Sequence, residues 1–120
     1  MTDSVSLLLP WPPSVNHYWH RSRSGGMFIS AKGRAFRDSV VWMCKSKGKV
    51  EGRVSVTVEA SPPDRRKRDL DNICKALLDG LTHAGVIEDD CCIDDLHIRR
   101  CDVKKDGSVF VRVMRIWEKK

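Results

Sequence analysis

The segment "RVSVTVEA" alternates apolar and polar residues, and this alternation limits the possible folds more than any other feature of the chain. Val54, Val56 and Val58 are separated by single residues, so in an extended strand their side chains point to one face. Such a strand needs a second layer that covers this apolar face. Three further strands are expected in the segments "SVSLLL", "IDDLHIRRCDV" and "SVFVRVMRIW".

Two amphipathic helices are expected to form the covering layer. The first spans about 31–46, with Ser30 as its N-cap and apolar residues at helical spacing. The second spans about 70–84 and ends before Gly85, a residue type favoured just beyond a helix. The order β-α-β-α-β-β predicts a single small α+β domain over residues 1–120, with two main helices on a mixed or antiparallel sheet.

The connecting segments carry their own signals. "KKDG", which contains Asp106 and Gly107, favours a hairpin turn between the last two strands. "HRSRSGGMF" contains two adjacent glycines and favours a mobile loop. We also expect Trp42, in the first helix, to lie in the core.

The composition argues against a membrane protein and against a disulfide framework. The longest apolar run, Leu7 to Leu9, ends at Pro10, far short of the roughly 18 residues of a spanning helix. The N-terminus lacks the basic region of a signal peptide. The five cysteines are an odd number without a Cys-x-x-Cys pair, which favours reduced thiols over a zinc site. We therefore expect a cytoplasmic protein that does not associate with a membrane.

Charge is distributed unevenly along the chain. The formal net charge is +6, but residues 17–49 hold eight basic and one acidic residue, whereas residues 69–102 hold nine acidic and three basic ones. A basic surface binds phosphates, and an acidic segment can hold a metal ion or perform acid–base chemistry. The pattern is typical of an enzyme that acts on nucleic acid, although surface charges also segregate by chance.

Asp69 and Asp71 lie where the second helix is expected to begin, directly after the basic run "RRKR". They converge if Asp69 ends the preceding loop and Asp71 lies in the first turn. A third acidic group, Glu88–Asp90, follows the helix, which carries the chain ~22 Å away. This group approaches Asp69 if the next strand runs back or if another subunit supplies it, and both arrangements remain open.

Clustered carboxylates of this kind are suited to Mg²⁺, which prefers oxygen ligands and leaves positions for water and phosphate. Lys75, one turn beyond Asp71, could stabilise charge that develops on a phosphodiester. A purely structural interpretation also exists. In it, Asp69 caps the helix, Asp71 complements the helix dipole and pairs with Lys75, and "EDD" is a polar turn.

Three motifs, in this order and spacing, resemble the RusA family of Holliday junction resolvases: "LPWPPSVNHYW", "DRRKRDLDNICKALLDGL" and "GVIEDD". The resemblance implies a homodimeric, Mg²⁺-dependent endonuclease that nicks four-way DNA junctions symmetrically and uses no organic cofactor. It implies catalytic roles for Asp69, Asp71, Asp90 and Lys75, with the three aspartates as metal ligands.

DNA binding is expected to occur mainly through phosphates. The basic residues nearest the predicted site are Arg65, Arg66, Lys67 and Arg68, and Arg21, Arg23, Lys32, Arg34 and Arg37 are expected to extend the track. The leading hypothesis is a junction-resolving endonuclease. The alternatives are an accessory protein that binds branched DNA without cutting it, and a nuclease for other branched DNA.

Overall fold

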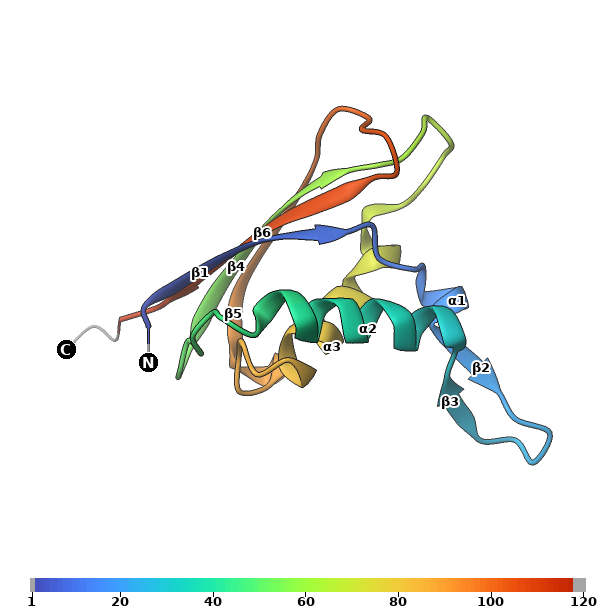
Figure 1. Cartoon of the computed structure of the whole chain (residues 1–120), viewed down its shortest axis with the longest axis horizontal. Helices are drawn as coiled ribbons and strands as arrows, with labels where there is room; N and C mark the ends of the chain where they lie inside the picture. Colours follow the sequence, from blue (N-terminus) through green and yellow to red (C-terminus); the bar gives the residue numbers. More distant parts are fainter. Residues whose placement is uncertain (1, 118–120) are drawn as a thin grey trace.

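The computed structural model describes residues 2–117, which form a twisted sheet with helices packed on one of its faces (Figure 1). In those residues no helix is long and apolar enough to cross a membrane. The elements, in chain order, are β1 (Ser4–Pro10), α1 (Val15–Tyr18), β2 (Trp19–Arg21), β3 (Met27–Ile29), α2 (Ala31–Cys44), β4 (Val54–Ser61), the 3-10 turn η1 (Leu70–Ile73), α3 (Cys74–His83), the 3-10 turn η2 (Asp90–Cys92), β5 (Ile93–Arg100) and β6 (Ser108–Arg115).

The main sheet is mixed and has the strand order β1-β6-β4-β5. β6 runs antiparallel to β1 and β4, whereas β5 runs parallel to β4. The predicted α+β class, with two main helices on a mixed sheet, is confirmed. The predicted hairpin of the last two strands is wrong, because β4 lies between β5 and β6.

The connection that precedes β5 explains why the last two strands do not pair with each other. β4, α3 and β5 form a crossover unit, in which the helix packs on the sheet and returns the chain parallel to the first strand. β5 thereby takes one side of β4, and β6 must pair on the other side. The turn itself forms, since Asp106 and Gly107 have φ angles of 66° and 69°.

The buried face of the sheet is built from β-branched side chains. Alternate residues of β4 and β6 point toward α2 and α3, and fully burying one valine side chain stabilises a fold by roughly 1.5–3 kcal/mol. The valines that are completely buried on these two strands are Val54, Val56, Val58, Val109, Val111 and Val113. The alternation in the sequence therefore fixes which face the helices cover.

Helix α2 begins as predicted. The Ser30 hydroxyl accepts a hydrogen bond from the Gly33 N–H at 2.9 Å, and Phe36 and Val40 are buried. The expectation for Trp42 is wrong, because this side chain is 70% exposed. Trp42 follows Val40 by two residues, about 200° around the helix, so it faces away from the core.

Gly33 lies where α2 crosses the end of α1, and we expect Gly33→Ala to destabilise the fold. A Cβ atom there would lie 2.8 Å from the Tyr18 carbonyl oxygen, closer than real contacts allow. Alanine in a helix interior is normally about 1 kcal/mol more favourable than glycine. At this position we expect the free energy of unfolding to fall by about 1–3 kcal/mol, as overpacking does in cores.

Urea denaturation of Gly33→Ala measures this effect, with Arg34→Ala, at an exposed position of the same helical turn, as the control. A Gly33→Ala protein more stable than the wild type would contradict the close packing of α1 on α2.

The second predicted helix forms in two parts. Leu70–Ile73 is a 3-10 turn, and the α-helix proper runs over Cys74–His83. Gly85 has a φ angle of 79°, a left-handed conformation that glycine adopts without steric cost. The predicted end of the helix is thus confirmed, whereas its first turn is wound more tightly than a regular α-helix.

The segment predicted as a mobile loop is a β-hairpin. β2 and β3 pair antiparallel, with Trp19 opposite Ile29 and Arg21 opposite Met27. Gly25, with a φ angle of 93°, makes the tight turn. The hairpin projects from the body of the molecule beside the start of α2 (Figure 1), and it carries exposed basic residues well beyond the sheet.

Candidate active site

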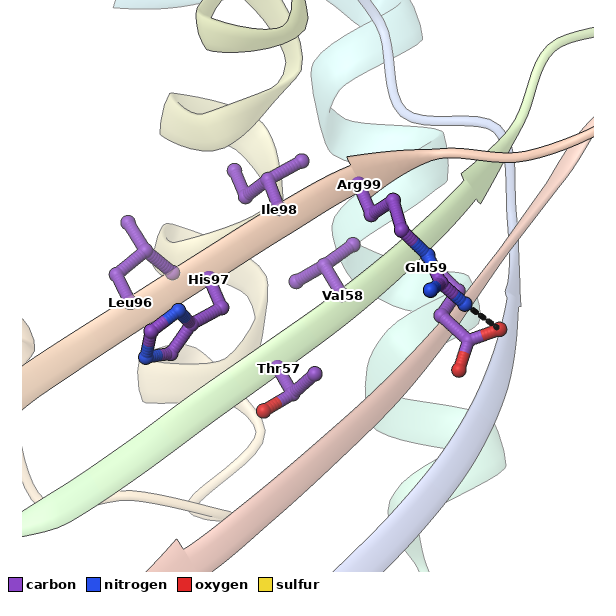
Figure 2. Close-up of a pocket in the computed structure, with 7 residues that line it drawn as sticks. All are labelled: Thr57, Val58, Glu59, Leu96, His97, Ile98 and Arg99. Carbon is purple, nitrogen blue, oxygen red and sulfur yellow. Dashed lines mark ion pairs between the residues drawn. The ribbon is translucent and has the colours of Figure 1, made fainter.

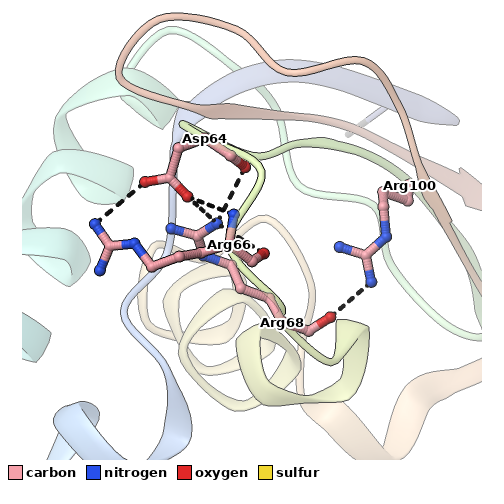
Figure 3. Close-up of polar contacts among 4 residues, drawn as sticks. All are labelled: Asp64, Arg66, Arg68 and Arg100. Carbon is pink, nitrogen blue, oxygen red and sulfur yellow. Dashed lines mark hydrogen bonds and ion pairs between the residues drawn. The ribbon is translucent and has the colours of Figure 1, made fainter.

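The loop between β4 and η1 is shaped by the charges that the sequence concentrates there. The Asp64 carboxylate accepts hydrogen bonds from the Arg66 backbone N–H at 2.9 Å and from the Arg68 guanidinium at 2.7 Å (Figure 3). The Arg68 hydrogen bond, followed by the one from Arg66, lowers the pKa of Asp64 to about 2. The loop is therefore organised around one ionised carboxylate.

Arg68 is the most strongly held of the four basic residues in this loop. Its guanidinium lies 5.9 Å from the centre of the Trp11 ring, and its carbonyl accepts a hydrogen bond of 2.7 Å from Arg100 at the end of β5. The side chains of Arg65, Arg66 and Lys67 are exposed. Arg66 also pairs with Asp64, at 3.3 Å. Arg68 thus positions the loop, and the exposed side chains of Arg65, Arg66 and Lys67 are accessible to a ligand.

The pKa of Asp64 predicts a pH dependence of stability. A carboxyl group whose pKa is lower in the folded than in the unfolded state stabilises the fold above its unfolded pKa. This contribution is therefore present above about pH 3.9 and is lost as the pH falls toward 2. We expect the free energy of unfolding of the wild type to decrease more steeply than that of Asp64→Asn between pH 5 and pH 2.5.

Urea unfolding at several pH values measures this difference, and a carboxyl NMR titration assigns it to Asp64. Asp38→Asn, at an exposed position on α2, is the control and should follow the wild-type curve. An Asp64 resonance that titrates near its ordinary pKa would contradict the ionised centre of the loop.

A basic pocket of about 460 Å³ lies beside this loop. It brings together Lys32 from the start of α2 and Arg66, Lys67 and Arg68 from the loop, with Asp69 at the same wall. Lys32, which was expected to extend the basic track, thus lies at the same pocket as three residues of the "RRKR" run. The other residues that line the pocket are Trp11, Pro12, Pro13, Ser14, His17, Asn72 and Ile73.

Asp69 and Asp71 occupy the junction that the sequence indicated. Asp69 has extended backbone angles, with φ −92° and ψ 135°, directly before η1, and Asp71 lies within that turn. Asp69 stands at the N-cap position, but its side chain makes no capping hydrogen bond. Both side chains are exposed, and in residues 2–117 neither carboxylate forms an ion pair. The capping interpretation of the Asp69 side chain is therefore wrong.

Lys75 does not pair with Asp71 in the part of the chain that the structure describes. Its ammonium group lies 6.0 Å from the centre of the Trp19 ring, at the base of the β2–β3 hairpin. Asp79, four residues after Lys75 on α3, instead accepts a hydrogen bond from the Tyr18 hydroxyl. Lys75 is thus held near an aromatic face rather than neutralised by a carboxylate.

Tyr18 and Asp79 form a polar contact that the sequence did not indicate. The Tyr18 hydroxyl donates a hydrogen bond to Asp79, and Arg37 lies 4.0 Å from the same carboxylate. Burial, and then the hydrogen bond to Asp79, raise the pKa of Tyr18. Tyr18 is the only tyrosine of the chain and is completely buried, so this contact fixes the hairpin base against α3.

Asp90 lies at the opposite end of α3 from Asp69 and Asp71. It begins η2 and accepts a hydrogen bond from Thr82, in the last turn of the helix. The ten residues of α3 separate the two acidic groups by about 15 Å along the helix axis. In the residues that the structure describes, no three His, Cys, Asp or Glu side chains are close enough to share a metal ion.

The two carboxylates at η1 nevertheless fit a magnesium ion. Mg²⁺ is commonly bound through one or two carboxylates, with water and substrate phosphate as its remaining ligands. Asp69 and Asp71 are exposed, and Asp69 lines the pocket that also holds the basic residues that a phosphate needs. Asp90 does not join them within one chain.

Comparison with known proteins matches residues 10–114 to the family model described as Endodeoxyribonuclease RusA. The crossover junction endodeoxyribonuclease of enterobacteria phage HK97 is 45% identical over 117 residues, which cover 95% of this chain and 97% of the relative. The Escherichia coli K12 enzyme RusA is 41% identical over 114 residues, covering 92% and 94%. The chain belongs to the RusA family.

The family that the three sequence motifs predicted is therefore confirmed. The match covers these motifs except Leu9, the first residue of the first motif, and it includes the pocket, η1, α3 and η2. The homologues from Escherichia coli and from the phages HK97 and 82 are all named crossover junction endodeoxyribonucleases. Five of the basic residues predicted to bind DNA lie outside the loop, with Arg21 on β2, Arg23 in the hairpin turn, and Lys32, Arg34 and Arg37 on α2.

Proposed function

We propose that residues 1–120 form one endonuclease domain that resolves four-way DNA junctions by paired symmetric nicks in a Mg²⁺-dependent reaction. The observation that carries this proposal is the near full-length similarity to crossover junction endodeoxyribonucleases from bacteria and phages. The geometry supports it, because the exposed carboxylate of Asp69 lines a pocket together with four basic residues, and the exposed Asp71 lies two residues further along the chain.

DNA would enter through its phosphates. Lys32, Arg66 and Lys67 surround the pocket beside Asp69, so a strand held there has a phosphodiester next to the carboxylates. Arg65 extends this surface along the loop. Arg21, Arg23 and Arg34 would contact a neighbouring arm, because they lie on the projecting β2–β3 hairpin and on the first turn of α2 beside it (Figure 1).

The chemistry would take place at η1. Asp69 and Asp71 would hold Mg²⁺, which, when bound, activates water and neutralises charge on the phosphodiester. Lys75 would stabilise charge that develops on the phosphate oxygens, since its ammonium lies one turn beyond Asp71 and is not neutralised by a carboxylate of residues 2–117.

We infer that Asp90 acts at the η1 site of a second copy. Its position at the far end of α3 separates it from Asp69 and Asp71 of its own chain. A homodimer offers a simple arrangement, because each copy can supply Asp90 to the other. Two equivalent sites also fit a four-way junction, which needs two matched cuts.

The test is a cleavage assay of the purified protein on a synthetic four-way junction, a flap and a linear duplex of the same sequence, with Mg²⁺ and with chelator. Paired nicks at symmetric positions of the junction alone are the expected result. Equal cleavage of the flap would instead indicate a nuclease for other branched DNA. Junction binding that survives chelator, with no cleavage in Mg²⁺ or Mn²⁺, would indicate a non-cleaving accessory protein.

A further inference from the structure

A mainly apolar groove adjoins the basic pocket of the candidate active site. It has a volume of about 390 Å³ and lies between residues 10–13, at the end of β1, and the N-terminal half of α2. Because three of its lining residues are prolines, we call it the proline groove. Four residues line both this groove and the basic pocket: Trp11, Pro12, Pro13 and Lys32. The two are therefore neighbouring parts of one surface.

The lining of the proline groove suits a flat ring with apolar faces. Trp11 and the three prolines form part of it, and the buried Phe36 contributes from α2. In the described part of the chain, Lys32 is the only charged residue that lines it. The Ser39 hydroxyl, also in the lining, already donates a hydrogen bond to the Ala35 carbonyl at 3.0 Å. Proteins that hold a nucleobase outside a duplex stack it between aromatic and apolar side chains of this kind.

The side of the groove formed by residues 10–13 is fixed before a ligand binds. The Trp11 ring lies 5.9 Å from the Arg68 guanidinium. A Cβ atom added at Gly107 would lie 3.0 Å from the Trp11 Cβ atom, so the turn that contains Gly107 packs tightly against Trp11. The proline rings restrict the backbone further. A preformed groove of this kind loses little conformational freedom when it binds a ligand.

The cavity along β4 and β5 does not offer the same arrangement. It has a volume of about 640 Å³ (Figure 2). Its charged residues, Glu59 and Arg99, form an ion pair of 3.7 Å with each other. Within residues 2–117 this cavity shares no lining residue with the basic pocket. It therefore does not continue the surface that is suited to phosphates, whereas the proline groove does.

The base and the phosphate of a nucleotide are joined through one sugar, so a site for the base must adjoin a site for the phosphate. At the branch point of a four-way junction the stacking of the duplex is interrupted, and a base leaves its stack there at lower cost than inside a duplex. We propose that the proline groove holds one unstacked nucleobase from the branch point, while the basic pocket holds a phosphate of the same strand. The proposal rests on the proposed function for its DNA substrate.

Photochemical crosslinking tests which residues contact the base. The probe is a four-way junction with 5-iodouracil at successive positions beside the branch point, bound in chelator and irradiated. An iodouracil that is stacked on an aromatic side chain forms a covalent bond to it. We expect one position to crosslink to the wild type, and tandem mass spectrometry to assign the bond to Trp11 or Phe36. Crosslinks at no position, or only to residues outside the groove, would overturn the proposal.

Filling the groove provides the matched comparison. Ala35 is exposed and lines the groove but not the basic pocket, and methionine is compatible with a helix. We expect Ala35→Met to reduce the crosslink at least about fivefold. Ala31→Met, at an exposed position of the same helix that lines neither pocket, should crosslink like the wild type. An undiminished crosslink in Ala35→Met, with altered sedimentation of the free protein, would assign the groove to a protein partner and overturn the proposal.

The salt dependence of junction affinity separates the groove from the basic pocket. A base–aromatic contact contributes about fivefold or more to affinity, and part of it replaces stacking lost in the junction. We therefore expect Ala35→Met to weaken binding about threefold or more, with an unchanged slope of log affinity against log salt. Lys32→Met should reduce this slope by about 0.9, because one fewer counterion is released. Unchanged affinity of Ala35→Met, or a slope changed as in Lys32→Met, would overturn the proposal.

These measurements use chelator and involve no cleavage, so the base site and the proposed function can fail separately. Paired nicking of the junction without a crosslink in the groove would overturn only the base site. A crosslink in the groove without nicking in Mg²⁺ would leave the base site in place and overturn only the endonuclease.

Discussion

Asp69→Asn is expected to reduce junction cleavage by about 100-fold or more, because loss of a metal-binding carboxylate removes several kcal/mol of transition-state stabilisation. Asparagine keeps the shape and the N-cap position of Asp69 but not its charge. Junction affinity should remain the same or increase, since one negative charge beside the phosphates disappears. Single-turnover cleavage and a gel-shift titration on the same four-way junction measure both quantities.

The matched control is Asp38→Asn, which removes an exposed carboxylate from α2 and should leave both quantities unchanged. Asp71→Asn should resemble Asp69→Asn. Cleavage by Asp69→Asn at the wild-type rate would show that the carboxylates at η1 are not the metal ligands.

A mixture of Asp69→Asn and Asp90→Asn proteins is expected to recover cleavage that neither protein has alone. If Asp90 acts on the other copy, a mixed dimer contains one site with both substitutions and one intact site. Random exchange makes about half of the dimers mixed, so about a quarter of the wild-type sites should return. If each chain used its own Asp90, every site would carry one substitution and nothing would return.

The measurement requires subunit exchange before DNA is added. Recovered activity should appear as single nicks rather than paired cuts, since a mixed dimer has one working site. The control mixture is Asp69→Asn with Asp71→Asn, two substitutions in the same half of the site, which should stay inactive in either arrangement. Recovery in both mixtures would point to contamination, and recovery in neither would assign Asp90 to its own chain or to no catalytic role.

Most of the fold could be predicted from local patterns. Local sequence determines the buried face of β4, the start of α2 at Ser30 and the end of α3 before Gly85. All three features lie where the sequence predicts them. The pairing of the last strands could not be predicted in this way. The Asp106-Gly107 turn is compatible with a hairpin, but the crossover through α3 commits β5 to β4, and this competition is decided by tertiary packing.

The same distinction applies to the candidate site: features that depend on neighbouring residues could be predicted, and those that depend on tertiary structure could not. The motif that carries Asp69, Asp71 and Lys75 is continuous in sequence, so the family and the location of the carboxylates could be predicted. The distance from Asp69 to Asp90 depends on the direction of β5 and on the length of α3, neither of which a motif encodes. The Tyr18–Asp79 contact joins residues 61 positions apart, and no periodicity indicates it.

Helix α3 has a consequence for how this chain tolerates change in length. It lies between the two acidic groups, so inserting one residue would shift them apart by about 1.5 Å and rotate one against the other by about 100°. In a dimer with reciprocal sites the same error would occur twice. Substitutions on the exposed side of α3 should accumulate freely, whereas insertions and deletions between Asp71 and Asp90 should be absent from functional descendants of this chain.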